Sequence, residues 1–270
     1  PDATMTEILR AVGLSKRFGG FTALDGVSAG FQAGALTGVI GPNGAGKSTL
    51  TNLLSGELAP SAGRIRIGGV DATGWPNWRF ARAGVGRSFQ RTNVLREMTV
   101  GENVRLAVDQ VFGRTKTRAE RAAWVDENLA LVQMMPAADK RPGEISGGMK
   151  QRIGIARALS MQPKVLLLDE PFGALDALTR AHLQDQVMAI HARLGTTVLM
   201  ITHDVDEAVL LSDRIVMMTN GPEATIGQVL DVTLPRPRDR LALAQDPVFT
   251  AARAEVLRFL HARHRNPAAA

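Results

Sequence analysis

The sequence predicts an α/β domain built around a parallel β-sheet, with a strand-rich segment before it and a helical segment inserted into it. Short apolar runs at residues 35–40, 165–168, 198–201 and 215–218 have the length and composition of buried strands. From residue 164 onward such runs alternate with helix-forming stretches. Strands that alternate with helices are typical of a parallel sheet covered on both faces.

The predicted elements follow one another in three stretches. Residues 7–69 read as short strands, among which Arg64-Ile65-Arg66-Ile67 alternates with the period of two expected for a half-buried strand. Residues 91–160 read as helical, and a helix over 117–135 is expected to stop before Pro136. A later helix is predicted to place one apolar face inward and to end at Gly195; that face consists of Leu183, Val187, Ile190 and Leu194. Beyond residue 220 the chain is rich in proline and arginine, with a short helix expected at 247–261.

Composition excludes several classes of function. The 270 residues include no cysteine, so neither a disulfide framework nor a thiolate metal site is possible. No apolar run reaches the roughly 18 residues that span a bilayer, and residues 1–7 lack the features of a signal peptide. We therefore expect a soluble chain that reaches a membrane only through a partner. Despite a net charge of +6, nucleic-acid binding is not expected, because the arginines are scattered and only mildly clustered at 236–240 and 258–265.

A glycine-rich motif lies between the predicted strand at 35–40 and a helix that begins near Lys47. It matches the phosphate-binding pattern G-x-x-x-x-G-K-[ST] in that pattern's required strand–helix context, and its residues are Gly41, Pro42, Asn43, Gly44, Ala45, Gly46, Lys47 and Ser48. Glycines allow successive backbone N–H groups to surround a phosphate. We expect Lys47 to contact the β- and γ-phosphates, Ser48 to bind Mg²⁺, and Thr49 to complete the nucleotide site. The Asn-Lys-x-Asp motif of a GTPase is absent from the sequence.

Two adjacent carboxylates, Asp169 and Glu170, end the apolar run 165–168. Buried acids are costly unless a cation or phosphate chemistry uses them. We therefore predict that Asp169 holds Mg²⁺ and that Glu170 addresses the attacking water. His203 follows the strand 198–201 and is expected at the same carboxyl edge of the sheet, where it would position that water against the γ-phosphate.

A third motif, Ile145-Ser146-Gly147-Gly148-Met149, stands about 20 residues before the acidic pair. A serine and two glycines at a helix start form a second anion-binding nest. The motif resembles the signature of ABC ATPases, written Leu-Ser-Gly-Gly-Gln in most members, and the order of all three motifs matches that family. Ile145 and Met149 depart from the pattern, and Met149 lacks the usual amide.

The resemblance implies a P-loop NTPase fold with a RecA-like core, an N-terminal antiparallel β-subdomain and an inserted helical subdomain. The expected limits are 1–90 and 161–220 for the core with the β-subdomain, 91–160 for the helical subdomain, and 221–270 for a C-terminal extension. By the same resemblance, Phe18 would stack on the adenine of ATP, Gln90 would contact Mg²⁺ and water, and Asp176 would lie at a dimer interface. Ser146, Gly147, Gly148 and Met149 would act on the ATP of the partner subunit.

The two halves of the chain resemble different importers. Residues 9–112 are similar to the branched-chain amino-acid importer ATPases, through residues 15–24 and 86–92. Residues 119–264 are similar to the nitrate/sulfonate/taurine importer ATPases, through residues 135–140, 170–180 and 203–214. A nitrate- or sulfonate-type anion is the expected solute, and a branched-chain amino acid is the alternative.

The resemblance also implies partners and a location. These are a second ATPase subunit, transmembrane permease subunits and, indirectly, a solute-binding protein, with the chain on the cytoplasmic face of the plasma membrane. Two rival readings remain open: a soluble ABC ATPase without a transport role, and a P-loop kinase or ATP sensor. The first would carry a coiled-coil insertion or a second cassette, and the second would not need the signature motif.

Overall fold

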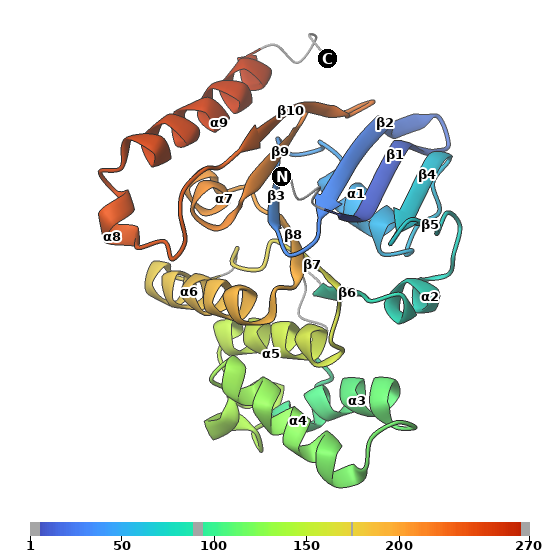
Figure 1. The fold of residues 1–270 in the computed structure, drawn as a ribbon, viewed down its shortest axis with the longest axis vertical. Coiled ribbons are helices and arrows are strands. Elements are labelled where there is room, and N and C mark those ends of the chain that lie inside the picture. The colour runs from blue at the N-terminus through green and yellow to red at the C-terminus, as the bar shows by residue number, and fades with distance from the viewer. Residues whose placement is uncertain (1–5, 89–93, 174, 266–270) are drawn as a thin grey trace. The chain divides into compact units, whose positions relative to one another are not determined.

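The computed structural model describes residues 6–88, 94–173 and 175–265, and its backbone forms two compact units (Figure 1). The first unit combines Pro1–Ala83 with Thr197–Ala270, and the second is Gly84–Thr196. The limits 91–160 expected for the helical subdomain stay a prediction. In the described part of the chain, no helix combines the length and the apolar character that crossing a membrane requires.

An antiparallel sheet opens the first unit, with strand order β2-β1-β4-β5. Its strands are β1 (Glu7–Phe18), β2 (Phe21–Gln32), β4 (Ala62–Ile67) and β5 (Val70–Asp71). In β4 the predicted alternation is confirmed: Ile65 and Ile67 are buried, whereas Arg64 and Arg66 are exposed. The first two strands are 12 residues each, longer than expected, and their pairing contains several register irregularities.

The second sheet of this unit has the strand order β10-β9-β3-β8. Strand β3 (Leu36–Ile40) is parallel to both β8 (Thr197–Ile201) and β9 (Arg214–Met218), while β10 (Ile226–Asp231) is antiparallel to β9. All residues of β3 and β8 are buried, as expected for strands covered on both faces. Helix α1 (Lys47–Leu54) follows β3, so the predicted strand–loop–helix arrangement is confirmed.

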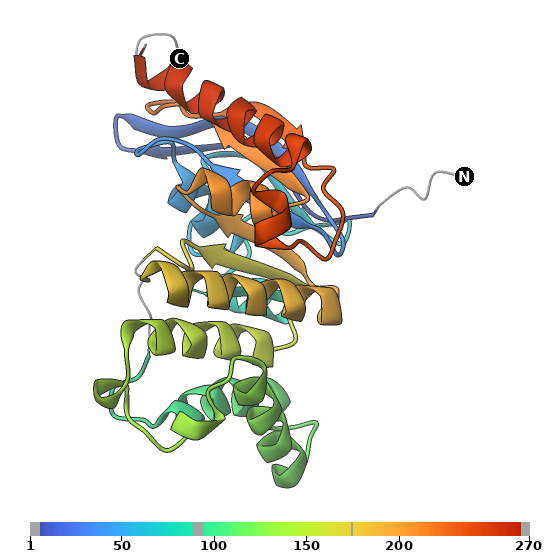
Figure 2. The same cartoon turned by 90° about the vertical axis from the view of Figure 1, so that its left-hand side faces the viewer.

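The C-terminal extension packs onto the same unit. Helix α7 (Val205–Leu211) precedes β9, and α8 (Arg240–Leu243) and α9 (Pro247–Arg265) end the chain. Figures 1 and 2 both show α9 lying beside α7 and β10. Gln228 of β10 donates a hydrogen bond to Glu255 of α9, and Arg253 of α9 pairs with Asp206 of α7. The described helix reaches Arg265, beyond the predicted end at 261, and strand β10 was not expected from the proline-rich sequence.

In the described part of the chain, the second unit contains one parallel strand pair and the helices α3 to α6. Strands β6 (Val85–Ser88) and β7 (Val165–Asp169) pair in parallel. Helix α2 (Asn77–Arg82) still belongs to the first unit. The helices of the second unit are α3 (Val100–Phe112), α4 (Arg118–Leu131), α5 (Gly147–Ser160) and α6 (Ala177–Leu194). Short 3₁₀ turns lie at Met135–Ala137 and Pro142–Glu144. Complete capping boxes begin α3 and α4, with Thr99 and Glu102 in the first and Thr117 and Glu120 in the second.

The end of helix α4 and the apolar face of helix α6 differ from the sequence-based expectation. Helix α4 stops at Leu131 rather than at 135, because Gln133 adopts a left-handed backbone (φ 56°) and Met134 donates its N–H back to Leu129 O at 2.7 Å. Helix α6 ends where predicted, at a left-handed Gly195. Its apolar face is shorter than expected, since Leu194 is exposed whereas the other three members of the face are buried.

Candidate functional site

The glycine-rich loop of the first unit connects the end of β3 to the start of α1. Gly44 (φ 84°) and Gly46 (φ 72°) have left-handed backbones, and a Cβ added to Gly46 would also lie 2.5 Å from Leu24 Cδ2. Lys47 begins α1, and its buried ammonium donates to Gly41 O at 2.8 Å and to Pro42 O at 2.9 Å. The carbonyl groups of the loop therefore hold the Lys47 ammonium beside the N-terminus of α1. Helix N-termini bind anions, so the cation lies where a phosphate group would bind.

Neighbouring side chains leave the loop's outer surface open. Asn43, Gly44 and Ser48 are exposed, and Thr49 is half-buried. Gly221 comes close behind the loop, since a Cβ added there would lie 2.5 Å from Gly44 O. Gly221 could not be predicted from the sequence, because only the folded backbone brings residues 44 and 221 together.

Phe18 lies at the end of β1 in the same unit, paired with Phe21 across the turn. Its ring is 46% exposed, and Lys16 Nζ lies 5.2 Å from the ring centroid. An exposed aromatic ring beside a cation can stack on a planar base. Strand β2 links this residue to the glycine-rich loop, because Leu24 of β2 packs against Gly46.

His203 lies at the same sheet edge as the glycine-rich loop, as predicted. Strands β3 and β8 run in parallel with Val39 opposite Ile201, and the Thr202 N–H donates to Val39 O at 3.1 Å. The next residue, Asp204, caps α7 by accepting from the Glu207 N–H at 3.0 Å. The exposed His203 therefore projects from a short turn held by β8 on one side and by α7 on the other.

In the second unit, Asp169 and Glu170 end β7. Asp169 is only 4% exposed, and its Oδ2 forms an ion pair with Arg87 Nη2 of β6 at 3.3 Å. Arg87 provides the positive charge that a buried carboxylate needs. Sequence reasoning missed this residue, because the pairing depends on β6 and β7 being neighbours. Glu170 has a left-handed backbone (φ 47°), a strained conformation for this residue that is typical of functional sites.

The signature motif begins α5 in the second unit. Ser146 is the N-cap, and its hydroxyl accepts from the Met149 N–H at 3.3 Å. Gly148 is buried against the first turn of α6, where an added Cβ would lie 2.9 Å from Thr179 Cγ2. Gly147 is exposed. Met149 takes part in the cap through its backbone, so the loss of the family's amide leaves the cap intact.

Asp176 is the N-cap of α6 and accepts from the Thr179 N–H at 3.0 Å. This hydrogen bond holds the pKa of the Asp176 carboxyl below its ordinary value. Because Gly148 packs on Thr179, the structure brings Asp176 and the signature motif to one region of the second unit. Gln90, the remaining predicted site residue, lies outside the described residues.

The predicted metal ligands have the right chemistry for Mg²⁺. Ser48 and Asp169 offer a hydroxyl and a carboxylate oxygen, which suit a hard cation that keeps several waters and binds substrate phosphates. In the described part of the chain, no three His, Cys, Asp or Glu side chains gather into a metal site of their own. The residues therefore fit a metal that arrives with a nucleotide.

Known proteins resemble the chain over almost its whole length. The sequence model of the family described as "ABC transporter" matches residues 24–173. The nitrate transport protein NasD of Klebsiella oxytoca is 54% identical over 263 residues, which cover 95% of this chain and 97% of that protein. The bicarbonate transport ATP-binding protein CmpC of Synechocystis sp. is 47% identical over 249 residues, and here the chain spans 92% of its own length but 36% of the relative's.

A solved structure supports the fold. The dimeric structure of MJ0796, a bacterial ABC transporter cassette, superposes with a TM-score of 0.76 at 26% identity and covers 84% of this chain. The predicted fold class is confirmed by this likeness. A similarity at this level extends to the family and not to a particular solute.

We predict that Lys47→Ala weakens the binding of ATP itself, by about tenfold or more, because a cation held at the glycine-rich loop is removed from the phosphates. Titration calorimetry with ATP measures the change. Lys140→Ala is the matched control, since it removes an exposed lysine far along the sequence from the loop and should leave the affinity unchanged. Equal affinities of the Lys47 variant and the parent would show that the loop does not hold the nucleotide.

Proposed function

The chain belongs to the ABC transporter family, and from that premise we propose that it is the ATP-hydrolysing subunit of an importer for nitrate or a similar small anion. The observation that supports the solute class is the 54% identity to a nitrate transport protein along 97% of that protein's length. The 47% identity to a bicarbonate transport protein points to the same class of small oxyanion.

ATP would bind on the first unit. Phe18 would stack on adenine, the backbone of residues 41–46 would surround the phosphates, and Lys47 would contact the β- and γ-phosphates. Ser48 and Asp169 would hold Mg²⁺, with Gln90 as a further ligand. When bound, the metal would neutralise charge on the phosphates, while the residues of the chain would position each reacting group.

Hydrolysis would use Glu170 and His203. Glu170, which follows β7 with a left-handed backbone, would accept the proton of the attacking water. His203 would contact the γ-phosphate and orient the water from the edge of β8. Arg87 would balance the charge of the Asp169 carboxylate before the nucleotide arrives, because the two side chains form a buried ion pair.

The active form would be a dimer arranged head to tail. Ser146, Gly147, Gly148 and Met149 of one subunit would meet the ATP held by the glycine-rich loop of the other, and Asp176 would lie at the interface. A helix start with an exposed glycine and a serine hydroxyl can receive a phosphate once the hydroxyl leaves its own cap. The dimeric form of the MJ0796 cassette is consistent with this arrangement.

Transport would couple to this dimer at the cytoplasmic face of the plasma membrane. Closing and opening of the dimer would drive the permease between its inward and outward states, and a solute-binding protein would deliver the anion to the permease. The branched-chain amino-acid importers remain the second candidate system, since residues 15–24 and 86–92 resemble their ATPases.

We predict that Glu170→Gln retains ATP binding and lowers turnover by about three orders of magnitude or more, because the carboxylate that receives the proton is lost. Phosphate release measures turnover, and size-exclusion chromatography should show a dimer that accumulates with ATP. The control is Glu223→Gln, a left-handed glutamate outside the proposed site. A Glu170 variant that hydrolyses ATP at the parent rate would refute the assignment.

The solute class is tested by reconstituting the chain in liposomes with a nitrate-type permease or with a branched-chain amino-acid permease. We expect ATPase stimulation and solute uptake with the nitrate type, because residues 119–264 and the C-terminal extension resemble that system. The stimulation should be weak. In the family that the chain resembles, the permease inserts a short helix into a groove beside residues 90–102, and in this chain these residues belong to the part that resembles the branched-chain importer ATPases. Strong coupling to the branched-chain permease alone would reverse the choice of solute.

A further inference from the structure

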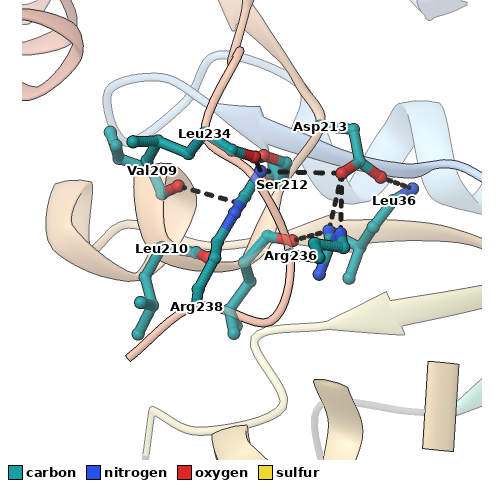
Figure 3. Close-up of polar contacts among 9 residues, drawn as sticks. Leu36, Val209, Leu210, Ser212, Asp213, Leu234, Arg236 and Arg238 are labelled. Carbon is teal, nitrogen blue, oxygen red and sulfur yellow. Dashed lines mark hydrogen bonds and ion pairs between the residues drawn. The ribbon is translucent and has the colours of Figure 1, made fainter. Parts of the chain in front are cut away.

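Two arginines of the C-terminal extension are packed against the end of helix α7. They belong to the segment Leu234-Pro235-Arg236-Pro237-Arg238, whose charges the sequence alone presented as part of a scattered basic surface. Figure 3 shows both guanidinium groups converging on Asp213 and on the backbone carbonyls that follow Val209. We call Arg236, Arg238 and Asp213 the arginine clamp.

Arg238 provides the buried part of the clamp. Its side chain is 1% exposed, and its Nη1 donates to three carbonyl oxygens at the end of α7: Val209 O (3.3 Å), Leu210 O (2.8 Å) and Ser212 O (2.9 Å). Its Nη2 donates to Leu234 O at 3.1 Å, a hydrogen bond between two residues of the C-terminal extension. Burial lowers the pKa of Arg238 to about 10, with a further lowering by Arg236 that Asp213 opposes. The side chain thus stays charged at neutral pH.

Arg236 and Asp213 connect this helix end to the central strand. Arg236 Nη2 donates to Leu211 O at 2.7 Å, and both Nε and Nη2 donate to Asp213 Oδ1, at 2.9 Å and 2.7 Å. The other carboxylate oxygen, Asp213 Oδ2, accepts from the N–H of Leu36 at 2.8 Å. Leu36 is the first residue of β3, the strand that leads into the glycine-rich loop. The clamp therefore binds the extension, the end of α7 and the start of β3 together.

The opposite end of α7 carries the turn with His203. The helix has only seven residues, and a helix of that length has little stability of its own. Its last carbonyls, which have no partners within the helix, are satisfied by the two arginines, and positive charge is favourable at a helix C-terminus. Near its first turn, Asp206 pairs with Arg253 of α9. Both ends of the helix are consequently held by the C-terminal extension.

We propose that the arginine clamp is a positioning device for His203: by fixing α7 from behind, Arg236 and Arg238 set the place of the histidine at the γ-phosphate. The inference rests on the role proposed for His203 in hydrolysis. Neither arginine contacts the nucleotide in this scheme. A displacement of about 1 Å at a catalytic group can lower a rate by as much as a hundredfold. A less firmly held α7 would therefore lower the rate of ATP hydrolysis and leave the affinity for ATP unchanged.

The test compares Arg236→Gln with Arg214→Gln in the full-length chain. Arg214 also pairs with an aspartate at 2.7 Å on the same unit, but its partner Asp231 lies on β10 rather than at the end of α7. We expect Arg236→Gln to lower kcat for ATP by about tenfold, with KM changed by less than about twofold. Arg214→Gln should change neither. All rates are measured well below the Tm of each variant.

A spectroscopic readout separates positioning from stability. The chain has five histidines, so NMR of ring-labelled histidine gives few signals, and His203→Gln identifies the one that belongs to His203. Arg236→Gln should shift or broaden that signal, and Arg238→Lys, which keeps the charge, should change it less. A lowered Tm with unchanged kcat and an unmoved His203 signal would overturn the proposal and leave the clamp a structural brace.

The same experiment distinguishes a failure of the proposal from a failure of the function on which it rests. His203→Gln should itself lower kcat by at least as much as the clamp variant. If His203→Gln hydrolyses ATP at the parent rate, the role of His203 is wrong, whatever the clamp variants do. If His203→Gln is inactive and Arg236→Gln is fully active, the clamp does not position the histidine.

Discussion

The hydrogen bonding of strand β3 is the constraint on which the first unit depends. The strand is parallel to β8 on one side and to β9 on the other, with all of its residues buried. A buried backbone must satisfy its polar groups, and here both neighbours do so. The glycine-rich loop and the His203 turn leave the same edge of this sheet, so their relative position is set by the register of two strands. Asp213 adds a side-chain contact at the start of β3.

Charge is the corresponding constraint in the second unit. Asp169 is buried at the end of β7, and a lone carboxylate there would be costly. Arg87 compensates its charge, and the following Glu170 adopts a strained left-handed backbone. The strained residue, Glu170, is the one proposed to accept a proton from the attacking water, and it directly follows Asp169, which is proposed to bind the metal. The carboxylate proposed to bind the metal thus already has its charge balanced by Arg87.

Much of this could be predicted from the sequence, because the signals were local. The apolar runs that became β3, β7, β8 and β9, and the glycine pattern between a strand and a helix, need only a few consecutive residues to be recognised. The missing parts depend on distant contacts. In the sequence, Arg87 is only one residue of the segment 86–92 that resembles the branched-chain importers, and its partner Asp169 becomes evident only when β7 lies beside β6. Arg238 reads as surface charge until four carbonyls from residues 209, 210, 212 and 234 surround it. Strand β10 follows from its pairing with β9 rather than from its own pattern.

The central claim is that each ATP is shared, held by the glycine-rich loop of one subunit and the signature motif of the other. Mixing two inactive variants tests it most directly. Lys47→Ala disables the first element and Ser146→Arg the second, so a mixed dimer keeps one complete site while each variant alone has none. Single-turnover hydrolysis should be absent from either variant and should return when the two are combined. Hydrolysis that stays absent in a mixture shown to contain mixed dimers, or that survives in Ser146→Arg alone, would contradict the shared site.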